Sequence, residues 1–145
     1  MSNNSNPIII EKTYNAPAEK VWKAITDRDE MKKWYFDLSG FKPEVGFEFR
    51  FVGKGKQGEE FVHLCKVTEI VHQKKLTYSW GYEGYGGISF VTFELFPEGD
   101  RTRVKLTHKG LETFPTTAHN AFARENFVEG WTYIIGTGLQ KFVEK

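Results

Sequence analysis

The strongest constraint on the fold is the pattern of apolar residues across residues 125–143. When successive residues are placed about 100° apart around a helix, one stripe collects six large apolar side chains: Phe127, Trp131, Ile134, Ile135, Leu139 and Phe142. Polar residues such as Glu129 and Lys141 fall outside this stripe. The pattern predicts a long amphipathic helix with an aromatic-rich face, and such a face must be buried against another part of the chain.

Gly138 lies inside this apolar stripe, close to Trp131 and Phe127 on the helical wheel. A glycine in the middle of a helix costs roughly 1 kcal/mol relative to alanine. On a buried face it also removes a side chain that a core would use. Two interpretations stay open: a space left between the helix and a sheet, or close packing of a strand backbone against the helix.

The first third of the chain predicts one strand followed by two short helices. Residues 7–14 form a β-branched run of strand length, and Pro17 suits the first turn of a helix over residues 18–26. Asp27, with a glutamate three residues later, is typical of an N-cap and starts a second helix that ends near residue 34. Three aromatic residues in a row then begin at Trp34. A sheet cannot accept all three on one face, so at least one should be exposed or lie over the mouth of a cavity.

The middle of the chain alternates between apolar and polar residues, as half-buried antiparallel strands do. Val45, Phe47, Phe49 and Phe51 should share one face of a strand. Further along, Thr102, Val104, Leu106 and His108 should share another. The predicted strands cover residues 45–52, 60–71, 76–80, 88–96 and 101–109. With hairpins dominating and the helices on one side, we expect a single α+β domain over residues 1–145, with residues 1–6 as a disordered tail.

Residues 53–58 contain the pattern G-x-G-x-x-G, which also occurs in dinucleotide-binding loops. That fingerprint requires a helix immediately afterwards, whose N-terminus holds the pyrophosphate. The residues that follow have the pattern of a strand. The glycines are therefore interpreted as a hairpin loop.

Composition narrows the classes of function. The chain holds 13 Phe, 6 Tyr and 4 Trp, a balance that favours large flat surfaces able to line a pocket. A net charge of +1 without a basic stripe argues against nucleic acid as a partner, and no apolar run is long enough for membrane insertion. Cys65 is the single cysteine, so no internal disulfide can form. With no signal peptide expected at the start, we expect a cytoplasmic protein.

Several short motifs, in this order along the chain, resemble one family. The matching residues are Ala16-Pro17, Val21-Trp22, Trp34, residues 66–70 (KVTEI), 76–80 (LTYSW) and 106–110 (LTHKG), and Gly130-Trp131. Together they span most of residues 8–143 and resemble bacterial proteins in the family of the ATPase activator of the ninety-kilodalton heat-shock chaperone. This family belongs to the START-like superfamily, also called SRPBCC or birch-pollen-allergen-like.

The resemblance implies the helix-grip fold, in which a curved antiparallel sheet wraps a long C-terminal helix around an apolar cavity. Chaperone activation is a property of larger members with a separate chaperone-binding domain, which we do not expect here because the first strand begins at Pro7. Relatives of this size look like binders of small molecules or lipids. A few superfamily members are aromatase or cyclase enzymes for polyketides.

Strand alternation and the helical stripe together predict the residues that line the cavity. They are Trp34, Phe36, Phe49, Tyr78, Trp80, Phe93, Leu106, His108, Phe127, Trp131, Ile135 and Gly138. For each of them, ordinary core packing is the alternative. His108 should point inward with a lowered pKa and could transfer a proton, and Tyr78 could donate a hydrogen bond to a ligand. A satisfied core histidine and a packing tyrosine are the simpler interpretation of these two residues.

The sequence thus predicts a protein that holds a hydrophobic or amphipathic ligand, such as a lipid, a polyketide-like or an aromatic compound. Alternatives are a cyclase-like or aromatase-like enzyme that uses the same cavity, and a chaperone-associated interaction module with an apolar patch around Trp34. That patch could also form a homodimer face. We expect no cofactor and no metal, because His63 and Cys65 share a strand face without enough further ligands.

Overall fold

The computed structural model of the protein describes residues 7–35, 41–54, 60–114 and 124–144. The predicted tail over residues 1–6 and the predicted lining residue Phe36 lie outside these ranges. Among the described residues, no helix is both long and apolar enough to cross a membrane.

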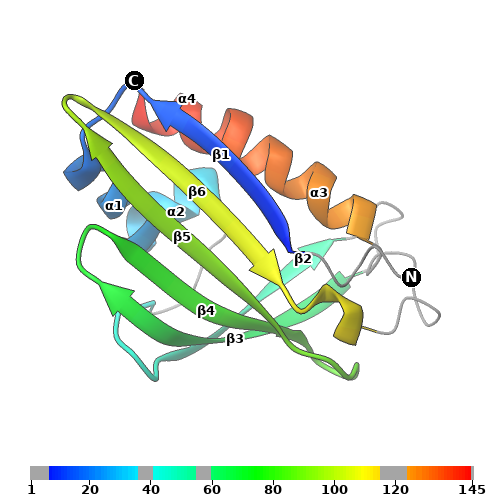
Figure 1. The fold of residues 1–145 in the computed structure, drawn as a ribbon. Coiled ribbons are helices and arrows are strands. Elements are labelled where there is room, and N and C mark those ends of the chain that lie inside the picture. The colour runs from blue at the N-terminus through cyan, green and yellow to red at the C-terminus, as the bar shows by residue number, and fades with distance from the viewer. Residues whose placement is uncertain (1–6, 36–40, 55–59, 115–123, 145) are drawn as a thin grey trace.

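The described strands form one antiparallel sheet (Figure 1) in the order β1-β6-β5-β4-β3-β2. Their bounds are Ile8–Tyr14 (β1), Glu48–Lys54 (β2), Glu60–Val71 (β3), Lys75–Tyr82 (β4), Ser89–Glu98 (β5) and Arg101–Lys109 (β6). Each strand from β2 to β5 pairs with the next one in sequence, and β1 pairs with β6. The α+β class and the strand content predicted from alternation are confirmed. The chain from Glu60 onward forms β3, which pairs with β2, and not the helix that a dinucleotide-binding fingerprint requires.

The long helix lies across the curved sheet and runs beside β1 (Figure 1). It consists of α3 (Arg124–Tyr133), a π-helical turn η4 (Ile134–Gly138) and α4 (Leu139–Val143). A shift in register between Val67 and Glu69 interrupts the pairing of β3 with β4. Such bulges bend a strand, which helps a sheet to curve around a helix.

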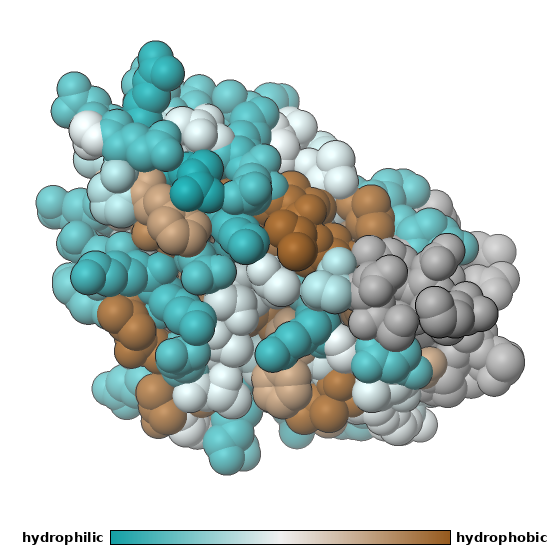
Figure 2. Space-filling model, in the orientation of Figure 1, coloured by the Kyte–Doolittle hydropathy of each residue, from teal (hydrophilic) through white to brown (hydrophobic). Residues whose placement is uncertain are grey.

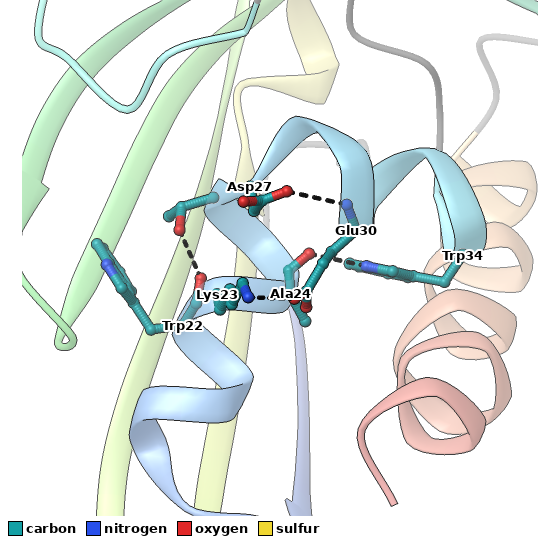
Figure 3. A network of polar contacts seen from close by, with 7 residues as sticks. Trp22, Lys23, Ala24, Asp27, Glu30 and Trp34 are labelled. Atoms are coloured by element: carbon teal, nitrogen blue, oxygen red, sulfur yellow. Dashed lines mark hydrogen bonds and ion pairs between the residues drawn. The ribbon is translucent and has the colours of Figure 1, made fainter. Parts of the chain in front are cut away.

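Two short helices follow β1, as predicted: α1 (Ala18–Thr26) and α2 (Arg28–Trp34). The Asp27 side chain accepts a hydrogen bond from the Glu30 amide at 3.1 Å, which caps α2 (Figure 3). The Trp34 indole N–H donates to the Ala24 carbonyl of α1 at 2.8 Å. These bonds fix the angle between the two helices, and α1 in turn contacts β5, β6 and α4.

The core fills the space between the concave face of the sheet and the helices. Inward-facing residues alternate along β5 and β6, and the run from Leu76 to Trp80 in β4 is buried throughout. From the long helix, the buried side chains are spaced four residues apart: Phe127, Trp131, Ile135, Leu139 and Val143.

The sequence prediction is wrong about the burial of residues at two places, one before β2 and one at the end of the long helix. Val45 was expected on the buried face of a strand, but it is 66 % exposed because β2 begins only at Glu48. Gly46 has a φ of +93°, which ends the extended backbone before that strand. In the long helix, Val143 is fully buried whereas Phe142 is half-buried, because the π-helical turn shifts the apolar stripe.

Candidate functional site

Ten of the twelve residues predicted to line a cavity are buried or half-buried between the sheet and the helices α2 and α3, within one aromatic interior. On the sheet these are Phe49, Tyr78, Trp80, Phe93, Leu106 and His108, and from the helices they are Trp34, Phe127, Trp131 and Ile135. The ring centroids of Trp80 and Trp131 lie 5.8 Å apart, and those of Phe93 and Trp131 lie 6.1 Å apart. The strand and helix patterns therefore placed these residues together correctly. Their role in holding a ligand stays a prediction.

Gly138 faces the end of α2. A Cβ atom at this position would lie 3.6 Å from the Trp34 carbonyl oxygen and 3.9 Å from the Trp34 ring, both ordinary van der Waals distances. An alanine would therefore fit, while a larger side chain would meet Trp34. The neighbour of this glycine is a helix end, which neither of the two interpretations of the sequence included.

His108 is held by hydrogen bonds on both ring nitrogens. The Trp131 indole N–H donates to His108 Nδ1 at 2.9 Å, so the proton of the neutral ring must sit on Nε2. Nε2 then donates to Ser89 Oγ at 2.7 Å, and the Ser89 hydroxyl donates to the Trp80 carbonyl at 3.4 Å. This chain of bonds ties the long helix to β6, β5 and β4.

Burial lowers the pKa of His108 to about 3, so the ring is neutral near pH 7. The sequence predicted this direction and the inward orientation. The Nδ1 lone pair, which a general base would need, is occupied by Trp131. In this arrangement His108 is a positioning residue for the helix.

Tyr35 and Tyr78 join their hydroxyl groups inside the same interior, with 2.9 Å between the two oxygens. Tyr35 follows α2 directly, and its ring stacks between Trp34 and Trp131 at centroid distances of 5.2 and 6.3 Å. Burial raises the pKa of both phenols, so neither ionises near neutral pH. Tyr35 as a whole is half-buried, but both hydroxyl groups of the pair are buried in the interior.

His63 occupies a second polar position, on β3. Its ring stacks on Phe51 at 4.4 Å between centroids and meets Trp80 and Tyr82 at 4.9 and 4.8 Å. Nδ1 donates to the Phe61 carbonyl at 3.0 Å, and burial lowers the pKa of this histidine to about 4. Both buried histidines are thus neutral at physiological pH.

Cys65 shares the inward face of β3 with His63, as alternation predicted, and it is buried. Burial raises the pKa of the thiol, so this side chain is neutral as well. Within the described ranges, no group of three or more His, Cys, Asp or Glu side chains could hold a metal ion.

A separate hollow of about 780 Å³, which we term the α1 cleft, opens beside α1, the start of α2 and the turn between β3 and β4. Its lining residues are Glu19, Trp22, Lys23, Thr26, Asp27, Arg28, Asp29, Phe41, Pro43, His72 and Gln73. None of them belongs to the predicted lining set. Phe41, which packs edge-to-face on Phe49 at 5.1 Å, connects this cleft to the aromatic interior.

The comparisons with known proteins agree with this architecture. The family model described as "Activator of Hsp90 ATPase homolog 1-like protein" matches residues 15–144. The chain belongs to this family. A comparison with curated protein sequences gave no significant match.

Solved structures extend the family assignment to nearly the whole fold. A protein from Bacillus halodurans is 28 % identical with a TM-score of 0.73, covering 96 % of this chain and 97 % of its own. A Mesorhizobium loti protein is 25 % identical with a TM-score of 0.76, covering 94 % and 96 % respectively. CalU16 from Micromonospora echinospora is 26 % identical with a TM-score of 0.72, covering 94 % of this chain and 75 % of its own. The helix-grip fold expected from the family resemblance is therefore confirmed.

Sequence reasoning missed three residues of the interior: Tyr35, Ser89 and Tyr82. Tyr35 belongs to the aromatic triplet that the sequence marked as unable to fit one face of a sheet. Trp34 and Tyr35 are half-buried and Phe36 lies outside the described residues, so the expectation of an exposed aromatic residue stays a prediction. Ser89 begins β5 in a turn-like context, and nothing in the sequence pattern marks it as a partner of His108. The α1 cleft had no sequence signal either, because its walls combine lining residues from 19–29 with Phe41, Pro43 and residues 72–73, which are distant in sequence.

Proposed function

We propose that this family member binds a small hydrophobic or amphipathic molecule between the sheet and the long helix. The interior is built of large flat aromatic rings, and a ligand placed among them would be stabilised by apolar burial. Its buried titratable groups are neutral, so they can orient a ligand by hydrogen bonds without the desolvation cost of a buried charge. Pockets with few polar groups among many apolar ones are the usual form of small-molecule sites.

The observation that carries this proposal is the hydroxyl pair of Tyr35 and Tyr78. Each phenol hydroxyl there is a hydrogen-bond partner of the other, and aromatic rings surround the pair. A ligand carbonyl or hydroxyl can replace one of these partners, exchanging one hydrogen bond for another at little net cost. Apolar parts of the ligand would then lie against Trp131 and Phe49.

The alternative of an enzyme has less support than a binding protein, because the residue expected to transfer a proton is not free to do so. A cyclase-like or aromatase-like reaction needs a group that can accept or deliver a proton. His108 was the candidate, and both of its ring nitrogens are already bonded within the protein. No observation on the described residues favours the chaperone-associated module over a ligand-binding protein.

The proposal can be tested with Nile red, an uncharged, carbonyl-bearing dye whose emission shifts in apolar surroundings. We expect saturable binding with one dye per chain. Tyr78→Phe keeps the ring and removes one hydroxyl, so it should weaken binding about five- to tenfold, the value of one neutral hydrogen bond. Tyr133→Phe makes the same change on a side chain that is 65 % exposed and should leave affinity unchanged.

Circular dichroism must first show that each variant is folded. A well-folded wild-type protein that gives no saturable dye signal would contradict the proposal. Equal loss of affinity in Tyr78→Phe and Tyr133→Phe would contradict the assignment of the hydroxyl pair.

A further inference from the structure

One indole N–H differs from the others in this protein. Trp34 donates to the Ala24 carbonyl, Trp80 to the Tyr82 hydroxyl and Trp131 to His108, each at 2.8 to 2.9 Å. Trp22, the fourth tryptophan, has no hydrogen-bond partner among the described residues, although its side chain is only 7 % exposed.

Trp22 lines the α1 cleft. Within the described ranges, no fully enclosed side-chain nitrogen or oxygen lacks a hydrogen-bond partner. The unpartnered N–H of Trp22 must therefore have access to the surface, and the cleft is the hollow that this residue lines. Figure 3 shows Trp22 projecting from α1 on the side away from Trp34. A nearly buried donor on a residue that lines a cleft is suited to an acceptor atom of a ligand.

The turn between β3 and β4 supplies a second uncommitted polar group. Gln73 has a φ of +58°, the one positive value at a non-glycine residue in the described ranges. Glycine or asparagine would occupy this left-handed position with less strain. The Gln73 carboxamide has no hydrogen-bond partner among the described residues, and it lines the cleft with His72, whose ring meets Trp22 edge-to-face at 6.0 Å.

Charges at the rim of the cleft restrict the class of ligand. The carboxylates of Glu19, Asp27 and Asp29 and the cations of Lys23 and Arg28 all belong to lining residues of the cleft, so the opposite charges nearly balance. An anion would meet the more numerous carboxylates, and a cation would compete with the two basic side chains. A volume of about 780 Å³ lies within the range that small-molecule sites occupy.

We propose that the α1 cleft binds a flat, uncharged small molecule, whose carbonyl oxygen or ring nitrogen accepts the Trp22 indole N–H and whose other polar edge pairs with the Gln73 carboxamide. This site does not depend on the function proposed for the aromatic interior, because the two share no lining residue.

The experiment uses the four indole N–H signals of the full chain in ¹H–¹⁵N NMR spectra, with Trp22→Phe to assign the Trp22 signal. Benzamide, which carries a carbonyl on a flat uncharged ring, is titrated beside benzoate and benzylamine. We expect benzamide to move the Trp22 signal in a saturable way while the other three indole signals stay in place. Benzoate and benzylamine should bind more weakly.

Two variants of the turn separate binding from structure. Gln73→Gly suits the left-handed backbone and keeps the fold, yet it should weaken benzamide binding about fivefold by removing one hydrogen bond. Lys74→Ala changes the neighbouring exposed residue, which does not line the cleft, and should leave the affinity unchanged. In Trp22→Phe, binding is followed at the backbone amides of residues 72–74 and should again be weaker.

Three results would overturn the proposal. The first is a Trp22 signal that does not move with benzamide up to its solubility. The second is unchanged affinity in both Gln73→Gly and Trp22→Phe. The third is movement of the Trp80 or Trp131 signals in place of Trp22, which would put the probe in the aromatic interior and would support the proposed function instead.

Discussion

At the residue scale, the titratable side chains of the interior are polar but uncharged. His108 and His63 are neutral because burial lowers the pKa of each, while burial raises the pKa of the interior tyrosines and of Cys65. Neutral donors and acceptors avoid the several kcal/mol that a buried ion costs. Neutral donors and acceptors still require hydrogen-bond partners when they are buried. The series of hydrogen bonds from Trp131 to His108 and from His108 to Ser89 supplies them.

Replacing His108 with leucine tests how much this series of hydrogen bonds contributes to stability. His108→Leu keeps a similar volume but leaves the Trp131 N–H and the Ser89 hydroxyl without their partner, and each unsatisfied buried group costs about 1–3 kcal/mol. We expect the free energy of unfolding in urea to fall by about 2–5 kcal/mol. Thr107→Val, at the neighbouring outward-facing position, should change it by less than about 0.5 kcal/mol. A His108→Leu protein as stable as the wild type would show that the series contributes nothing to stability.

At the element scale, the long helix departs from a regular α-helix where it passes β1. In the π-helical turn η4, the Ile135 carbonyl accepts a hydrogen bond from the Tyr14 hydroxyl, and the Gly136 carbonyl accepts one from Lys12 Nζ at 3.0 Å. Both donors come from β1. The strand therefore satisfies carbonyls of the widened turn from outside the helix.

Removing the Tyr14 hydroxyl should loosen this turn. Tyr14 is fully buried, so Tyr14→Phe leaves the Ile135 carbonyl without this donor and should cost about 1–2 kcal/mol of stability. Amide hydrogen exchange should accelerate across residues 134–143 more than in β5. Uniform acceleration across the whole chain would mean that the hydroxyl acts on global stability alone.

The strands and helices were predictable because burial imposes a period on the sequence. Alternation identified the inward face of β6, and the apolar stripe identified Phe127, Trp131 and Ile135 in the helix. A helical wheel assumes one uniform turn, so it could not foresee η4 or the burial of Val143. Alternation also failed at Val45, where a glycine with positive φ ends the extended backbone.

At the scale of the whole molecule, the candidate sites depend on contacts that no local pattern encodes. Tyr35 pairs with Tyr78 across 43 positions of sequence, and both Trp22 and Gln73 line the α1 cleft. The inward direction of Tyr78 could be read from its strand. Its partner Tyr35 could not be predicted from the sequence, because the path of the chain after α2 is set by packing against the sheet and the long helix.

The two buried histidines also make the stability of the whole fold depend on pH. Their pKa values are about 3 for His108 and about 4 for His63, against an ordinary value of 6.5. At pH values between the folded-state pKa and 6.5, these histidines are protonated in the unfolded chain but not in the folded protein. The free energy of unfolding therefore falls as the pH falls. The contribution of the two neutral histidines to stability is fully present above about pH 6.5 and is lost as the pH falls towards their folded-state pKa values.

From pH 8 to pH 5, each histidine should reduce the free energy of unfolding by about 2 kcal/mol, or about 4 kcal/mol for the pair. Urea denaturation at both pH values measures this difference. His63→Phe keeps an aromatic ring against Phe51 and removes one titrating group, so it should roughly halve the pH dependence even if it lowers stability at pH 8. A wild-type free energy of unfolding that is equal at pH 8 and pH 5 would mean that the histidines can be protonated in the folded state, and the neutral interior inferred from their burial would then be wrong.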